Sequence, residues 1–318
     1  MLRDILTVGL MTLLVGSTPC WCQGLNAEAE VTDEPITSGY ALVYRLKAGE
    51  LIRWRTRHQA TTMTRINKVE NFDRAVTETT KVWRVKEVRE DGSMVLEQSI
   101  DQLELSQSVG GGEEIRYNRQ ADEQPPIRFE SIAGSVGVPL ALVTISPSGK
   151  VLEKEAIYKQ SQMGLDDVAV PLPQGRVEIG HTWYSPSEFA ASVEDGRQVI
   201  IKLRKSYTLD AVKQDIATIH VETEILTPGD SPRVKSQLIQ EMTSGTIKFD
   251  LQAGRVVSKK MEWDEEVVGF STAQSYMDFH ARFTEDLLAQ SDDLEAEVTA
   301  KPEKILIRGR EEGPILRK

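Results

Sequence analysis

The sequence predicts a mainly β protein, with antiparallel sheets in two similar halves that form a half-barrel or a sandwich, and with few short helices. Three observations predict this fold class. From Tyr40 onward apolar and polar residues alternate, hairpin turns recur, and the order of these elements is repeated. With 40% hydrophobic and 27% charged residues, the composition is that of a globular protein with a sizeable core.

Hairpin turns separate the alternating stretches. The strongest signal is Asp91-Gly92, which lies between the stretches 82–88 and 94–97. Two further hairpins are predicted to turn at residues 146–149 and at residues 253–254. The chain is therefore expected to fold largely as successive antiparallel pairs.

The elements occur twice in the same order, and their shared residues are short. The opening Gly49–Trp54 is echoed by Gly180–Trp183, the hairpin Trp83–Asp91 by Tyr207–Asp215, and the turn Gly149–Val151 by Gly254–Val256. Prolines interrupt the pattern near residues 170–175, which indicates a join there. The predicted organisation is a signal peptide (1–22), a flexible leader (23–38), a first β-rich half (39–170), a second β-rich half (171–288) and a poorly ordered charged tail (289–318).

The first 22 residues predict export to the periplasm or the outside of the cell. Arg3 precedes an apolar run over residues 5–15, and small residues lead to a cleavage site after Cys22. The run is short for a membrane span. The alternative is a lipid anchor on Cys20, for which the preceding Pro19 is a poor fit.

Cleavage after Cys22 would remove both cysteines of the chain. Disulfides, a thiol nucleophile and a cysteine-ligated metal are then excluded. The net charge of −11 disfavours nucleic acid as a partner. No second apolar segment reaches spanning length, so no transmembrane anchor is expected in the mature chain.

Three short helices are predicted, at Glu130–Val138, Glu153–Met163 and Thr284–Leu294. They are few beside the strand signals, which dominate the chain.

No constellation of catalytic, cofactor-binding or metal-ligating residues is predicted. The histidines His58, His181, His220 and His280 lack the spacing of a ligand pair, although His220 would share a strand face with Glu222. The triplet Gly110–Gly112 precedes two glutamates, which would repel a phosphate. We therefore expect the protein not to be an enzyme.

Adjacent carboxylates are the remaining catalytic candidates. Asp166-Asp167 and Glu265-Glu266 are such doublets. Neighbours on a strand point to opposite faces, so these doublets are more typical of solvated charges than of a converging acid–base pair.

Four tryptophans follow the predicted signal peptide, namely Trp54, Trp83, Trp183 and Trp263. One large ring per structural unit is most simply a core residue. The alternative is a row of rings that lines an apolar concavity and contacts an apolar ligand.

The Gly-x-Thr-Trp opening at Gly180, the Val-x-x-Val-x-x-Asp-Gly hairpin at Val85 and the Gly-Lys-Val return at Gly149 resemble a group of exported bacterial β-proteins of unknown function. More distantly, the arrangement is similar to the lipoprotein-carrier superfamily, over roughly residues 40–284. That resemblance implies a curved antiparallel sheet whose helical lid encloses an apolar cavity. The closer group implies no catalytic residues.

These observations favour a non-catalytic exported envelope protein that holds an apolar ligand or a lipidated chain on a concave sheet. One alternative is a structural or protein-interaction module that presents an edge strand or an acidic face to an envelope protein. Another is a carboxylate-dependent hydrolase, which would need a cleft with two converging carboxyls.

Overall fold

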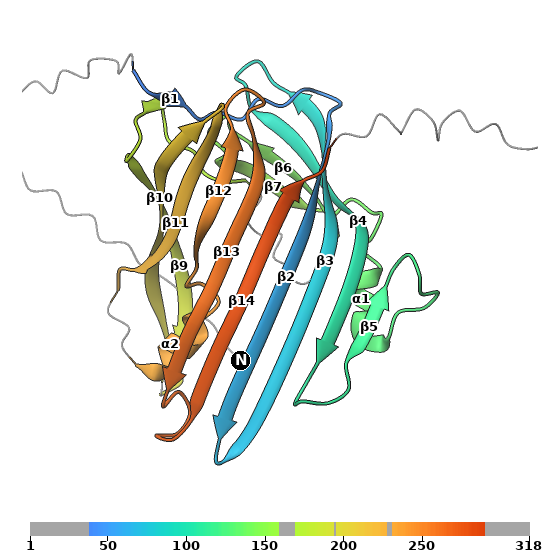
Figure 1. Ribbon diagram of the computed structural model, residues 1–318, viewed down its shortest axis with the longest axis vertical. Helices are drawn as coiled ribbons and strands as arrows, with labels where there is room; N and C mark the ends of the chain where they lie inside the picture. The colour runs from blue at the N-terminus through green and yellow to red at the C-terminus, as the bar shows by residue number, and fades with distance from the viewer. Residues whose placement is uncertain (1–37, 159–168, 194, 228–230, 290–318) are drawn as a thin grey trace, which may run out of the picture. The chain divides into compact units, whose positions relative to one another are not determined.

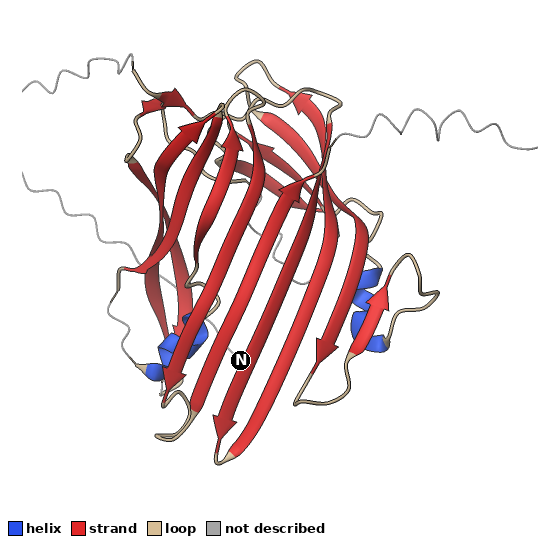
Figure 2. Cartoon of the chain, in the orientation of Figure 1, coloured by secondary structure: helices blue, strands red, loops and turns tan. Residues whose placement is uncertain are grey.

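The computed structural model describes residues 38–158, 169–193, 195–227 and 231–289 (Figure 1). These residues belong to one compact unit that is mainly β, with antiparallel pairing and two short α-helices (Figure 2). The predicted fold class is therefore confirmed. The predicted signal peptide and nearly all of the predicted leader and tail lie outside the described residues.

The strands are, in chain order, β1 (Tyr40–Ala41), β2 (Leu51–Ile66), β3 (Val69–Val88), β4 (Met94–Ser108), β5 (Ile115–Asn118), β6 (Ala141–Ile145), β7 (Val151–Ala156), β8 (Arg176–Val177), β9 (Thr182–Ser192), β10 (Gln198–Lys213), β11 (Ile216–Ile225), β12 (Ser244–Asp250), β13 (Arg255–Val268) and β14 (Tyr276–Leu287). The helices are the 3₁₀ helix η1 (Ile127–Phe129), α1 (Glu130–Ala133) and α2 (Pro232–Leu238).

One sheet contains twelve of these strands, in the order β7-β6-β4-β3-β2-β14-β13-β12-β11-β10-β9, with β5 added beside β4. The short strands β1 and β8 form a separate pair. Consecutive strands are mostly neighbours, as the hairpin turns predict. Two pairings in the sheet join strands that are not consecutive: β6 lies beside β4, and β14, the last strand, pairs with β2 along its length and so joins the two halves (Figure 1).

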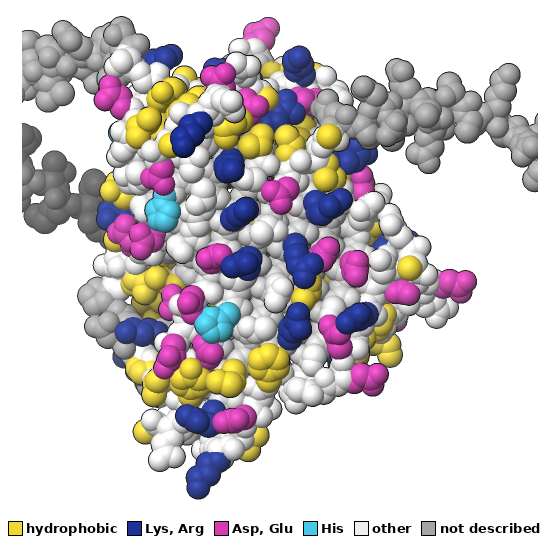
Figure 3. Space-filling model, in the orientation of Figure 1, with side chains coloured by type: hydrophobic (Ala, Val, Ile, Leu, Met, Phe, Trp, Pro, Cys, Tyr) yellow, Lys and Arg dark blue, Asp and Glu magenta, His cyan; other side chains and the backbone are white. Residues whose placement is uncertain are grey.

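The two faces of the sheet differ in polarity because side chains alternate along each strand. On the outer face, cross-strand ion pairs link Arg53 to Asp101 and Arg282 to Glu262. Figure 3 shows basic and acidic side chains interspersed over this face. The outer face is therefore solvated, and the apolar side chains are collected on the inner face.

The inner face holds one hydrophobic core that both halves share. It contains Val143 of β6 and Ile219 of β11 among its fully buried residues. In a flat sheet these strands would lie seven spacings apart, roughly 34 Å. The sheet is therefore curved, and its inner face is concave.

A segment that lies outside the sheet crosses this concave face. We call residues Leu42–Leu46 the strap; Leu42, Tyr44 and Leu46 are buried in the core. The strap contacts a hairpin turn of each half: the Tyr44 amide donates to the Pro147 carbonyl at 2.8 Å, and the Arg45 amide donates to the Gly254 carbonyl at 3.0 Å.

One backbone hydrogen bond recurs at equivalent places in the two halves. The Gly49 amide donates to the Val85 carbonyl at 2.8 Å, and the Gly180 amide donates to the Leu209 carbonyl at 2.7 Å. Both glycines have positive φ, at 82° and 90°, which an L-residue adopts only with strain. The turns that open the two halves are thus built in the same way.

The strand register corrects one detail of the predicted repeat. Trp83 lies opposite Ile52, and its counterpart Tyr207 lies opposite Trp183. Trp183 therefore occupies the position of Ile52, whereas the repeat in the sequence aligns it with Trp54. A shift of two residues keeps the same face of the strand, so alternation alone does not reveal the difference.

The helix predictions are largely wrong. In Glu130–Val138 only α1, four residues long, is helical. Most of the described part of Glu153–Met163 belongs to strand β7, and the residues from 159 to 163 lie outside the described chain. Thr284 begins no helix, because it lies within β14, which pairs with β2 on one side and with β13 on the other.

The α2 helix was not predicted, although its start carries a sequence signal. Pro232 occupies the first turn, and the Ser231 hydroxyl accepts a hydrogen bond from the Val234 amide. This pairing of a serine N-cap with a proline is a common helix start. Buried Val234 and Leu238 hold α2 against β9 and β10.

Candidate binding site

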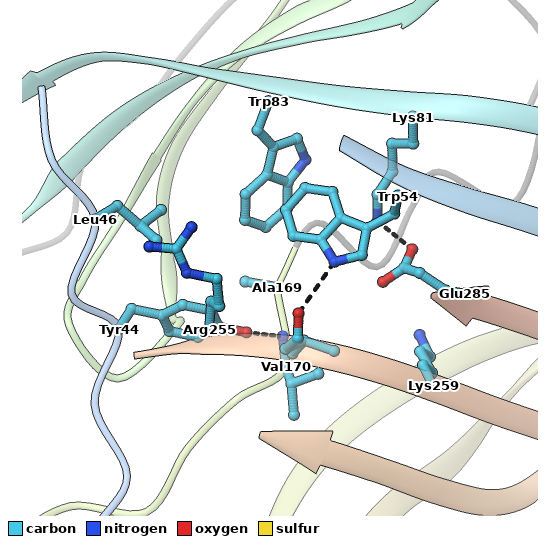
Figure 4. Close-up of a pocket in the computed structure, with 11 residues that line it drawn as sticks. Tyr44, Leu46, Trp54, Lys81, Trp83, Ala169, Val170, Arg255, Lys259 and Glu285 are labelled. Atoms are coloured by element: carbon cyan, nitrogen blue, oxygen red, sulfur yellow. Dashed lines mark hydrogen bonds and ion pairs between the residues drawn. The ribbon is translucent and has the colours of Figure 1, made fainter. Parts of the chain in front are cut away.

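A small cavity lies beneath the strap, where the two halves meet (Figure 4). Its volume is about 20 Å³, which is room for about one water molecule. Apolar, aromatic and charged side chains share its wall. The lining residues are Tyr44, Leu46, Trp54, Lys81, Trp83, Ala169, Val170, Arg255, Val256, Lys259 and Glu285.

Two of the four predicted tryptophans line this cavity. Trp54 and Trp83 pack edge to face, with their ring centroids 4.9 Å apart, and both are buried. Trp183 is also buried, but it stacks on Tyr207 in the second half. Trp263 is partly exposed, and its Nε1 donates to the Gln240 carbonyl at 2.8 Å. The structure thus brings Trp54 and Trp83 together and separates the other two from them.

A buried ion pair completes one wall of the cavity. The Lys81 ammonium bonds to the Glu285 carboxylate, and these side chains are only 9% and 8% exposed. The Lys81 Nζ lies 4.9 Å from the ring centroid of Trp54 and 5.4 Å from that of Trp83. The cation is therefore held by a carboxylate and by two aromatic faces.

This pair was not predicted from the sequence. Lys81 lies two residues from Trp83, so alternation puts both side chains on the inner face. A lysine at a core position is the signal that could have identified Lys81. Nothing local could have identified Glu285 as its partner, because β14 is brought beside β2, and thus one strand away from β3, only by the tertiary fold.

A second ion pair closes the cavity beside the strap. Arg255 Nη1 lies 2.6 Å from Glu50 Oε1, and both side chains are largely buried. Arg255 begins β13, whereas Glu50 belongs to the turn before β2. This contact therefore ties the second half to the opening of the first.

Of the two indole N–H groups at the cavity, one has a hydrogen-bond acceptor and the other has none among the described residues. Trp54 Nε1 donates to the Val256 carbonyl at 3.0 Å. Trp83 Nε1 is buried and has no hydrogen-bond acceptor among the described residues. A buried donor without an acceptor is uncommon in folded proteins.

Tyr44 connects the strap to the cavity wall. Its hydroxyl accepts a hydrogen bond from the Val170 amide at 2.9 Å, and its ring packs edge to face with Phe249 at 5.4 Å. Burial raises the pKa of Tyr44 well above its usual value. The phenol therefore stays neutral and packs as a core ring.

The histidines lie apart from one another. On the outer face, His280 contacts Asp264 at 2.9 Å and Asp278 at 3.0 Å. His58 lies edge-on to Trp263, with ring centroids 5.9 Å apart, and desolvation lowers the pKa of its imidazole. Among the described residues, no three His, Cys, Asp or Glu side chains are arranged to hold a metal ion.

The carboxylate doublets do not converge in the described chain. Glu265 is partly buried and its pKa is raised, first by desolvation and then by the charge of Asp264, whereas Glu266 is exposed. The two side chains thus lie on opposite faces, as strand geometry predicts. Asp166-Asp167 lies outside the described residues.

A second pocket of about 100 Å³ lies on the outer face. It is lined mostly by polar side chains, including Glu78 and Glu104, which are directly opposite each other on β3 and β4. Arg57 pairs with Glu78. Its polar wall is unsuited to an apolar ligand.

Of the helices in the described chain, none combines the length and the apolar character that crossing a membrane requires. No protein-family model and no curated protein matches this sequence. The function is therefore inferred from the site itself.

Proposed function

We propose that this chain is a non-catalytic exported envelope protein that binds an apolar ligand or a lipidated chain on the concave face of its sheet. Export is inferred from the amino-terminal sequence alone. The observation that carries the proposal is the strap, which inserts Leu42, Tyr44 and Leu46 into the apolar interior without joining the sheet.

The strap is attached to the rest of the molecule mainly by its side chains. Within the described residues, its backbone hydrogen bonds are those of Tyr44 and Arg45 to the two hairpin turns. Burial of each large apolar side chain contributes about 1.5–3 kcal/mol. A ligand that buries a similar apolar area could offset the loss of these contacts, so the strap is an exchangeable occupant of the concave face.

The small size of the cavity supports a ligand that replaces the strap rather than one that binds beside it. Ligand pockets usually measure about 300–1,000 Å³, whereas the space beneath the strap is about 20 Å³. An acyl chain therefore fits only when the strap leaves.

A reversible lock on the strap tests the proposal. Ala41 and Arg176 lie opposite each other in the β1–β8 ladder, at a separation that suits a disulfide. We expect Ala41→Cys/Arg176→Cys, in a Cys20→Ser/Cys22→Ser background, to bind a fluorescent long-chain fatty acid at least about tenfold more weakly when oxidised. Reduction should restore the affinity of the same molecule, and titration of probe fluorescence measures both states.

The control is the Cys20→Ser/Cys22→Ser protein, whose affinity should not respond to the reductant. Lack of probe binding in every state contradicts the ligand function. Equal affinity in the oxidised and reduced variant contradicts the role of the strap.

A further inference from the structure

The two end strands of the large sheet, β9 and β7, differ in how their free edges are protected. At one edge, β9 contains Pro186, which cannot donate to a further strand. The Gln237 side chain of α2 also bonds both backbone groups of Ser192: its Oε1 accepts from the amide and its Nε2 donates to the carbonyl, each at 2.8 Å. A helix side chain thus takes the place of the next strand, and this edge is closed.

The other edge, β7, carries no such protection among the described residues. All six of its residues are exposed, and no described strand lies beyond it. Val151 and Leu152 are 41% and 52% exposed, and Ile157 follows at 49%. An exposed edge with apolar side chains is a template for a further strand.

We propose that β7 is a docking site for an extended segment of another polypeptide, in which basic residues alternate with apolar ones. The segment adds a strand to the sheet by backbone hydrogen bonds, and its side chains give specificity. This interaction surface is an edge of the sheet and not its concave face.

Charge indicates the chemistry of the partner. Glu153 and Glu155 lie on the same side of β7, because they are two residues apart in a regular part of the ladder. Basic residues at alternate positions of a neighbouring strand would lie opposite these two carboxylates. The residue between these two basic residues would lie opposite Lys154, and apolar residues further along the same strand would cover Val151 and Leu152.

A second copy of this chain fits the edge poorly. A two-fold axis between antiparallel β7 strands runs normal to the sheet, so it pairs residues whose numbers are both even or both odd. Within the regular part of β7, from Glu153 to Ala156, the central registers then place Glu153 opposite itself, Glu155 opposite itself, or Glu153 opposite Glu155. Each register opposes like charges, which is destabilising. The partner is therefore a different sequence.

Two peptides of opposite charge test the proposal on the full chain. One has the six-residue length of β7 and alternates Lys with Val, Ile and Thr; in its twin, Glu replaces Lys. We expect the basic peptide to slow hydrogen exchange at the amides of Val151–Ala156 and to bind about tenfold more tightly than its twin.

Charge reversal supplies the decisive comparison. Glu153→Lys/Glu155→Lys should reverse the preference, so that the acidic peptide binds more tightly. The matched control is Glu222→Lys/Glu224→Lys, which makes the same charge change on β11, a strand paired on both sides. This control should leave the preference unchanged.

Other outcomes overturn the proposal. The docking site is ruled out if neither peptide protects β7 from hydrogen exchange. It is also ruled out if the preference for the basic peptide survives charge reversal. Protection of Val151–Ala156 that rises with the concentration of the protein alone assigns the edge to a second copy instead. None of these results bears on fatty-acid binding, so the two proposals fail separately.

Discussion

Lys81 has an unusual environment for a lysine, because its charge is buried between two tryptophans and one carboxylate. The pair with Glu285 connects β3 to β14 across β2. Desolvation of two charges offsets much of their attraction, so such a pair contributes little net stability. Loss of one partner is different, since it leaves the other charge buried and unpaired.

We therefore expect Lys81→Met to lower the free energy of unfolding by about 3–5 kcal/mol. The double variant Lys81→Met/Glu285→Met should recover most of this loss, because both charges are then absent. Urea denaturation of the three proteins measures the effect. If the double variant is no more stable than Lys81→Met, the buried charge of Glu285 does not explain the destabilisation.

We expect His58 to make stability depend on pH. Desolvation lowers its pKa below the usual value of 6.5 in the folded protein. Above that value the imidazole is neutral in both states and contributes nothing. As the pH falls below 6.5 the unfolded chain takes up the proton first, so the free energy of unfolding decreases.

We expect His58→Gln to reduce the loss of stability between pH 7 and about pH 5. Chemical denaturation at both pH values, for wild type and variant, gives the difference. An equal loss in both proteins would show that other groups account for the pH dependence.

At the scale of elements, the position of the strap depends on two turn glycines. A Cβ at Gly254 would lie 2.6 Å from the Arg45 Cβ, and one at Gly149 would collide with the Val170 carbonyl. Both glycines also have positive φ. The turns of the two halves therefore lie so close to the strap and its surroundings that only glycine, which has no Cβ, fits at these two positions.

Gly254→Ala should destabilise the protein by at least about 1 kcal/mol more than Gly111→Ala. Gly111 has a similar φ, 69° against 62°, but a Cβ there meets nothing within 4 Å. The control thus carries the conformational strain without the collision. Similar free energies of unfolding for the two variants would contradict a tight contact between turn and strap.

The sequence predicts those elements whose signals are local. Asp91-Gly92 and the turns near Gly149 and Gly254 each connect the expected strands. The prediction of a helix from Thr284 fails over the described residues up to Leu287, where a mixed apolar pattern resembles a helix until pairing with β2 and β13 is known. The ion pair of the candidate site could not be predicted for the same reason, because Lys81 and Glu285 are 204 residues apart and meet only in the folded sheet.

At the scale of the molecule, the two halves share one sheet and one hydrophobic core. β14 pairs with β2 from Tyr276–Arg65 to Leu287–Trp54, and Tyr44 of the strap packs on Phe249 of the second half. Each half alone would expose a long strand edge and part of a shared core.

We expect neither residues 38–170 nor residues 171–289 to fold when produced separately. Their amide proton spectra should lack the dispersion of a folded protein, whereas the spectrum of the full chain should show it. A well-dispersed spectrum from either fragment would show that the halves are independent domains.

Because β14 pairs with β2, the strands of the sheet follow one another in space in the order β9 to β14 and then β2 to β7. A circular permutant that is opened between β7 and β9, and closed by a linker from Ala289 to Gly39, would run from β9 to β14 and then from β2 to β7. Nearly every neighbouring pair of strands would then be consecutive in sequence. Its contact order would be lower than that of the natural chain, so stopped-flow refolding should be faster at equal stability.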